Sequence, residues 1–98
     1  MNAQTSPAPL PLTDRIRIAY NLLADDPGLS FVSIADVRRM VGTYQATPEG
    51  VDAALREMAG LPDVSIRPAR FMNVTLSRDD REGAVSIGGR ECHLLWIG

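Results

Sequence analysis

Hydrophobic residues first recur at helical spacing in residues 13–24, where Thr13 is expected to act as the N-cap. The apolar positions of this segment are Ile16, Ala19, Tyr20 and Leu23, with Ile18 and Leu22 beside them. A face this wide predicts a helix that packs on more than one side. Residues 25–28 end it, because Pro27 cannot continue the hydrogen-bond ladder and Gly28 accepts a positive φ.

Residues 33–58 predict two short capped helices joined by a tight polar turn. Ser33 opens the first helix, and Asp36 follows three residues later as a carboxylate variant of the capping box. Thr47 opens the second, with Pro48 at the first helical position and the Glu49 carboxylate at the positive end of the helix dipole. The apolar positions are Ile34, Val37, Met40 and Val41, then Val51, Ala54, Leu55 and Met58.

The pattern beyond residue 60 is typical of strands. Residues 64–67 alternate apolar and polar side chains, whereas residues 93–97 are almost uniformly apolar. We expect these two runs to pair as an antiparallel hairpin that covers the three helices. Between them, Ser77 and Asp80 resemble the cap of a single helical turn, and residues 88–89, both glycine, predict a tight turn into the final strand.

The composition favours a small globular protein. The chain has 98 residues, of which 45% are hydrophobic, and contains no run long and apolar enough to cross a membrane. Residues 1–11 contain three prolines and predict a disordered tail ahead of a domain that spans residues 12–98. Since there is no secretory signal pattern and Cys92 has no internal disulfide partner, a cytoplasmic location is expected.

The order of helix, short strand (residues 29–32), helix, turn, helix and two-stranded hairpin resembles the winged-helix superfamily. The end of the chain, from residues 76–84 through Ile87 to residues 93–95, is also similar to the ends of small winged-helix-like proteins of actinobacteria and their phages and plasmids. The resemblance implies an α+β fold: a three-helix bundle with a helix-turn-helix and a C-terminal antiparallel β-hairpin, with a short helical turn inserted in the wing. It also implies a transcriptional, phage or plasmid regulator.

The same resemblance assigns residues to double-stranded DNA. In the superfamily the second helix of the pair lies in the major groove and the hairpin tip contacts phosphates or the minor groove. Carried onto this chain, that arrangement directs Gly50, Ala53 and Arg56 toward bases and Arg67, Arg70 and Arg90 toward the backbone. Arg38 and Arg39 are further candidates, although cations late in a helix also complement its dipole as ordinary surface residues.

The charge of the chain favours an alternative. Its net charge is −2, and the outward face of the predicted recognition helix carries Glu49, Asp52 and Glu57 against Arg56. Phosphates would repel that face. The alternative is a protein-interaction module that uses this acidic face for a basic partner, or Phe71 and Met72 as an exposed apolar contact. A domain of this size has a small core, so pairing with a second copy is a further expectation.

The residues do not predict catalysis, a metal or a cofactor. Cys92 and His93 are neighbours on a predicted strand, where adjacent side chains point to opposite faces and cannot converge on a metal. His93 is the only histidine and has no flanking nucleophile motif. Residues 88–90 lack the lysine and following helix of a phosphate-binding loop. We therefore expect a binding protein and not an enzyme.

Overall fold

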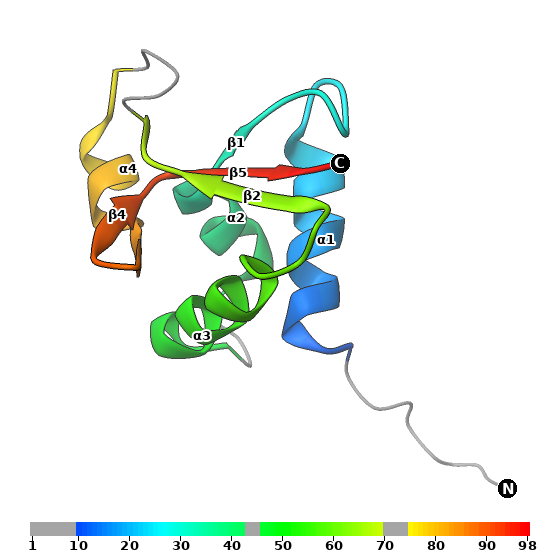
Figure 1. Ribbon diagram of the computed structural model, residues 1–98, viewed down its shortest axis with the longest axis horizontal. Helices are drawn as coiled ribbons and strands as arrows, with labels where there is room; N and C mark the ends of the chain where they lie inside the picture. Colours follow the sequence, from blue (N-terminus) through cyan, green and yellow to red (C-terminus); the bar gives the residue numbers. More distant parts are fainter. Residues whose placement is uncertain (1–9, 43–45, 70–74) are drawn as a thin grey trace, which may run out of the picture.

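Helices dominate the first part of the chain and short strands dominate the rest (Figure 1). The structure is a computed structural model that describes residues 10–42, 46–69 and 75–98. The elements are α1 (Leu12–Leu23), β1 (Val32–Ser33), α2 (Ile34–Val41), α3 (Pro48–Met58), β2 (Val64–Arg67), α4 (Arg78–Glu82), β3 (Val85–Ile87), β4 (Arg90–Cys92) and β5 (Leu94–Ile97). The described chain is therefore α+β, as the hydrophobic pattern predicts.

The larger sheet has the strand order β1-β5-β2, and both strand pairs are antiparallel. Val64 lies opposite Ile97 and Ser65 opposite Trp96, so the predicted pairing of the two apolar runs is confirmed. The His93 N–H donates to the Arg67 carbonyl at 3.0 Å, just before β5 begins. The first strand is shorter than predicted, because only Val32 of residues 29–32 belongs to β1.

A second, two-stranded sheet is formed by residues that lie between β2 and β5 in the sequence. Its strands β3 and β4 are joined by Gly88 and Gly89, whose φ angles are 59° and 79°. Two successive positive φ angles are characteristic of the two-residue turns that match the twist of a hairpin. The predicted tight turn is confirmed, but it leads into β4, and the chain reaches the larger sheet only after His93.

The predicted caps hold at two helices. The Thr47 Oγ1 accepts from the Gly50 N–H at 3.0 Å, and Pro48 occupies the first turn of α3. At α4, Ser77 and Asp80 each accept from the other's backbone N–H at 3.1 Å. These reciprocal bonds form the predicted capping box.

Two other helix starts differ from the prediction. Helix α1 begins at Leu12 behind Pro11, so Thr13 is already inside the helix. Ser33 is the N-cap residue of α2, as predicted, but its side chain makes no cap bond, and its hydroxyl donates to the Asp80 carboxylate at 2.6 Å. The hydroxyl predicted to satisfy the start of its own helix therefore links that helix to α4.

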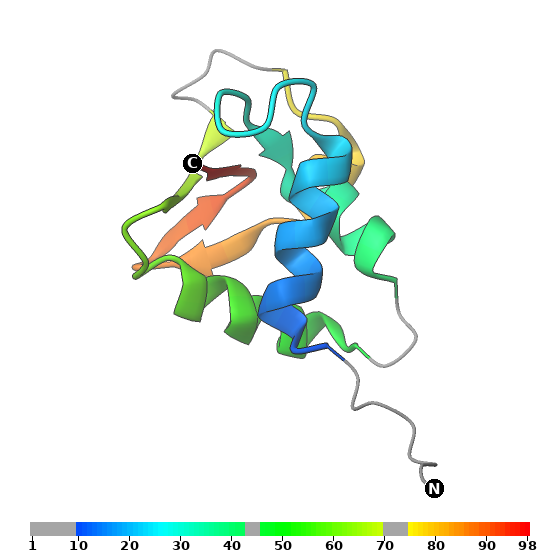
Figure 2. The same cartoon turned by 90° about the vertical axis from the view of Figure 1, so that its right-hand side faces the viewer.

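The core lies between α1, α2 and α3, one face of the larger sheet, and the buried residues Val85 and Cys92 of the smaller sheet. Its fully buried large side chains are Tyr20, Ile16, Ile34, Leu55, Met58, Leu95, Val37 and Val85. Figure 2 shows α1 in front, with α2 on one side of it and the strands on the other. α1 contacts α2, α3 and β5, yet its Ile18 and Leu22 edge is exposed.

Candidate nucleic-acid interface

Helix α3 presents an exposed face because its apolar positions turn inward. Val51, Leu55 and Met58 are buried, whereas Glu49, Ala53, Arg56 and Glu57 are exposed. Gly50 is half-buried, and a Cβ at this position would lie 3.2 Å from Thr47 Oγ1 and 3.8 Å from Leu12 Cδ2. Gly50 therefore faces Thr47 and α1 and does not share the exposed surface of Ala53 and Arg56.

Arg38 and Asp52, which the sequence assigns to competing surfaces, bind each other. The Arg38 guanidinium forms an ion pair with the Asp52 carboxylate, and their side chains are 19% and 27% exposed. The Arg38 Nε also donates to the Gly83 carbonyl at 2.8 Å, and the Nη nitrogens lie 3.4 Å from the carbonyls of Pro48 and Ala84. Arg38 thus connects α2, α3 and the start of β3, and it neutralises one of the three acids on α3.

Arg39 is exposed but does not present an uncompensated charge. Its guanidinium pairs with Asp36 on the same helix and, at 3.3 Å, with Asp79 on α4. Surface pairs of this kind contribute little to stability, but they lower the positive potential available to a phosphate.

Arg56 brings the exposed face of α3 together with the β3–β4 hairpin. Its Nε donates to the Ser86 carbonyl at 2.8 Å, and Ser86 lies opposite Glu91 in the hairpin register. Arg90 lies one position further along, opposite Ile87. Helix α3, which the sequence predicts as the reading helix, therefore meets the β3–β4 hairpin at this hydrogen bond. That hairpin lies in the sequence between the two strands that are predicted to form the wing.

Arg67 and Arg90 lie on segments that converge at His93. Arg67 ends β2, and its Nε donates to the Ser65 Oγ at 2.9 Å, while Arg90 opens β4. Both side chains are exposed. Within residues 10–42, 46–69 and 75–98, neither of them nor Arg56 forms a salt bridge, in contrast to Arg17, Arg38, Arg39 and Arg78. We call Arg56, Arg67 and Arg90 the arginine set.

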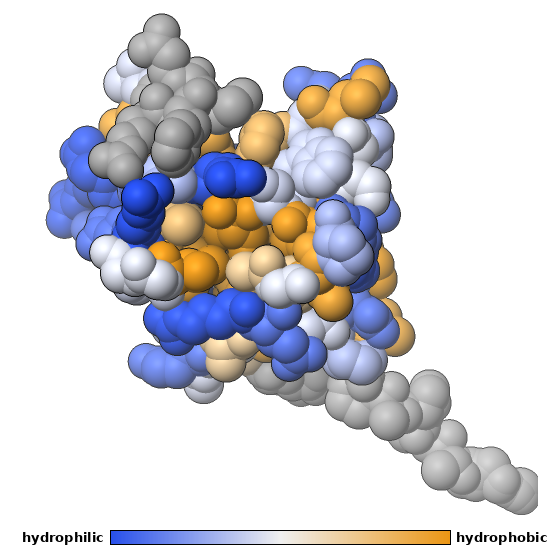
Figure 3. All heavy atoms as spheres, viewed as in Figure 1, coloured by the Kyte–Doolittle hydropathy of each residue, from blue (hydrophilic) through white to orange (hydrophobic). Residues whose placement is uncertain are grey.

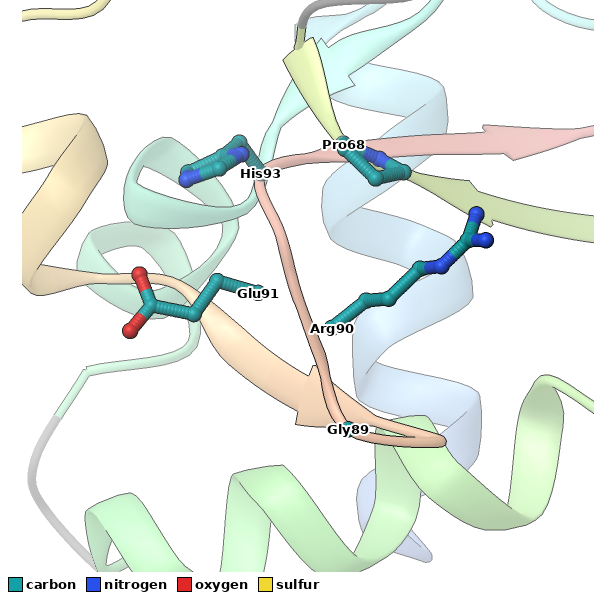
Figure 4. A pocket seen from close by; sticks show the side chains of 5 residues that line it. All are labelled: Pro68, Gly89, Arg90, Glu91 and His93. Carbon is teal, nitrogen blue, oxygen red and sulfur yellow. The ribbon is translucent and has the colours of Figure 1, made fainter.

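A pocket of about 330 Å³ lies beside the hairpin, lined by Pro68, Gly89, Arg90, Glu91 and His93. Figure 4 shows Arg90 and Glu91 pointing to opposite sides of β4, with His93 on the same side as Glu91. The His93 Nδ1 accepts from the Ala69 N–H at 3.2 Å, so this ring nitrogen is occupied by the backbone. The pocket therefore combines one cation and one anion and has no cluster of like charges.

Cys92 is buried at the end of β4, so one of the Cys92–His93 neighbours faces the core as predicted. Burial raises the pKa of its thiol, and Arg90 and Arg67 oppose that effect only partly. A thiol kept neutral in this way is a poor nucleophile. Among the residues that the structure describes, no three His, Cys, Asp or Glu side chains are grouped as metal ligands.

The face that carries β2 and β5 has an apolar centre. Figure 3 shows hydrophobic side chains gathered between these strands and α3, bordered by hydrophilic ones over α3 and the hairpin. Arg56 and Arg90 belong to α3 and β4 at this border, and Arg67 is the last residue of β2. Arg70, Phe71 and Met72, which the sequence also proposes for contacts, lie outside the described residues.

The sequence does not predict a second surface, which lies between α1 and α2. Ile18, Leu22 and Met40 are 47%, 70% and 45% exposed, and they line a groove of about 210 Å³ between α1 and α2. The signal is present in the sequence, because Ile18 and Leu22 widen the apolar face of α1. A wide face predicts additional internal packing, whereas the structure leaves this edge of the helix at the surface.

Comparisons with protein-family models, with curated proteins and with solved structures find no match to this chain. None of the helices in the described parts of the chain has the length and apolar character needed to span a bilayer. Functional assignment therefore depends on the geometry of the described side chains.

Proposed function

We propose that this chain is a small cytoplasmic winged-helix protein that binds double-stranded DNA, with α3 as the groove-facing helix and the β3–β4 region as the wing. The element order supports this proposal. Two short helices follow β1, and α4 and the hairpin lie in the sequence between the paired strands β2 and β5. Fold alone does not define function, so the assignment needs a site.

The observation that carries the proposal is the arginine set. Arg56, Arg67 and Arg90 are exposed without a carboxylate partner in the described chain, and Arg56 joins α3 to the hairpin. The negative charge that opposes them on α3 is reduced, because Asp52 is paired with Arg38. Guanidinium groups on neighbouring elements are well suited to phosphate oxygens.

This site supports backbone contact more than base reading. Arg38 and Arg39 are engaged with carboxylates, so we leave them out of the proposed DNA contacts. Glu49 and Glu57 remain exposed on α3, and only Ala53 and Arg56 are favourable to a groove. Binding is expected to be weak, tolerant of sequence and strongly dependent on salt.

The test is fluorescence anisotropy with a mixed-sequence duplex over a range of salt concentrations. Replacing Arg67 and Arg90 together by alanine should weaken binding and reduce the salt slope by about two, one for each phosphate that is no longer neutralised. Arg78→Ala is the control, because this exposed arginine on α4 pairs with Glu82 and its removal also takes away one positive charge. If the double variant and the control bind like the original chain, DNA binding through the arginine set is wrong.

A protein-interaction module is the second candidate, and the apolar centre with its charged border favours it (Figure 3). Protein contact surfaces commonly have an apolar centre and a polar rim. For a basic partner, reversing the exposed Glu49 and Glu57 to arginine should abolish capture of that partner by the tagged domain. Asp52 is unsuited to this test because its reversal would also break the pair with Arg38. Undiminished capture by the Glu49→Arg, Glu57→Arg variant would exclude the acidic face.

A further inference from the structure

We infer that two copies of this chain associate through the groove between α1 and α2, with their α1 helices packed antiparallel. The inference is independent of DNA binding. It starts from Ile18, Leu22 and Met40, which are 47%, 70% and 45% exposed and lie together along one groove. Most exposed apolar side chains occur singly, whereas these three share one surface with Ala19 and Val41.

The residues that line the groove are spaced as in a helix contact. Ile18 and Leu22 are one helical turn apart on α1, and Met40 projects from the neighbouring α2. A helix placed in this groove would contact both α1 and α2, in the way that side-chain ridges of one helix fill the grooves of another. The flexible Met40 side chain adapts readily to such a neighbour.

The charges along α1 select a second copy as the occupant. Arg15 lines one end of the groove, and the exposed Asp25 follows the other end of α1. Positions 18 and 22 are equally distant from Tyr20, and so are positions 15 and 25. A two-fold axis beside the middle of α1 therefore places Ile18 against Leu22 of the other copy. It also brings Arg15 toward the segment that follows α1 in that copy, where Asp25 lies two residues beyond the end of the helix. A surface that complements itself in this way is the requirement for a symmetric dimer.

The local contacts leave these groups available. Arg15 donates from Nη2 to the Val41 carbonyl at 2.9 Å, which fixes the guanidinium at the groove without neutralising it. Neither Arg15 nor Asp25 has a salt bridge in the described ranges of the chain. An interface of two short helices is small, so a dissociation constant on the order of micromolar is expected.

The experiment is sedimentation velocity with light scattering on the full chain over a concentration series. The expected species has twice the 10.6 kDa mass of the single chain and dissociates on dilution. Leu22→Glu should raise the dissociation constant about tenfold or more, because a carboxylate would be buried in the apolar contact. Leu29→Glu is the matched control, since Leu29 is 77% exposed but lies outside the groove.

The electrostatic half of the inference has its own variants. Asp25→Arg should weaken the dimer, and Arg15→Glu combined with Asp25→Arg should restore it, because the charges are exchanged and remain complementary. A monomer at every concentration, a dimer indifferent to Leu22→Glu, or a double reversal that fails to restore association would each overturn the proposal. A variant without residues 1–9 tests whether the chain's own first residues occupy the groove instead of a second copy. A full chain that stays monomeric while this variant dimerises would also overturn the proposal.

Discussion

Arg38 joins three parts of the candidate interface through one guanidinium group. It pairs with Asp52 on α3 and hydrogen-bonds the Gly83 carbonyl, while its own backbone belongs to α2. Gly83 is itself tightly placed, because a Cβ there would lie 2.9 Å from the Cα and Cβ of Ala35. The position of the hairpin against α3 thus depends on the guanidinium of Arg38, whose side chain is only 19% exposed.

Replacing Arg38 by methionine should destabilise the domain. The change leaves the Asp52 carboxylate unpaired in a partly buried position and the Gly83 carbonyl without its donor, which together cost about 2 to 4 kcal/mol in the free energy of unfolding. Arg39→Met is the matched control at the neighbouring position, where the side chain is 59% exposed and its removal should cost less than about 1 kcal/mol. Urea denaturation measures both, and equal costs would contradict the role given to Arg38.

Among the elements, α4 is attached to the body of the domain through Asp80. This carboxylate accepts from the Ser33 hydroxyl at 2.6 Å and from the Ser77 N–H at 3.1 Å. The bond from Ser33, followed by that from Ser77, lowers the pKa of Asp80 against the opposing effect of desolvation. The ionised form is therefore the one that holds α4 against the start of α2.

This lowered pKa predicts how stability depends on pH. The unfolded chain binds a proton more readily at Asp80 than the folded chain does, so the contribution is fully present above the ordinary carboxyl pKa. It is lost as the pH falls through the depressed folded value. Ser33→Ala should therefore cost about 1 to 3 kcal/mol at neutral pH and markedly less near the acid limit of folding.

Thermal unfolding of the original chain and of Ser33→Ala, over a pH series, measures this difference. Ser86→Ala is a suitable control, because Ser86 is exposed and the bond from Arg56 is made to its backbone carbonyl and not to its hydroxyl. A cost of Ser33→Ala that does not change with pH would show that the charged form of Asp80 is not involved.

The sequence predicts those elements whose contacts are local. The Thr47 cap and the Ser77–Asp80 box each close within three residues, and the alternation of β2 follows from period-two patterning. The bonds of Ser33 to Asp80 and Arg38 to Gly83 span 47 and 45 residues, and no local rule fixes either partner. For the same reason the sequence assigns Arg38 to a DNA contact and Asp52 to a protein contact, although the fold pairs them.

At the scale of the whole molecule, the β3–β4 hairpin, which carries Arg90, and the α1–α2 groove lie on different sides. Figure 1 shows the hairpin on one side of the domain and α1 on the other. A dimer formed through α1 therefore keeps both hairpins at its outside, where they remain free. If both proposals hold, the dimer presents two separated phosphate-binding surfaces, and a duplex long enough to reach both should bind more tightly than a short one.

That expectation gives a test in which DNA length and oligomeric state are varied together. The original chain should bind a duplex of several helical turns at least about tenfold more tightly than a duplex of one turn, about 10 base pairs, at equal concentration of sites. Leu22→Glu should bind the short duplex normally and lose the advantage of the long one, since 70% exposed Leu22 lies in the groove and away from the hairpin. Leu29→Glu should retain the advantage. An equal gain from length in Leu22→Glu and the original chain would mean that the two arginine sets do not act together, even if each copy binds DNA.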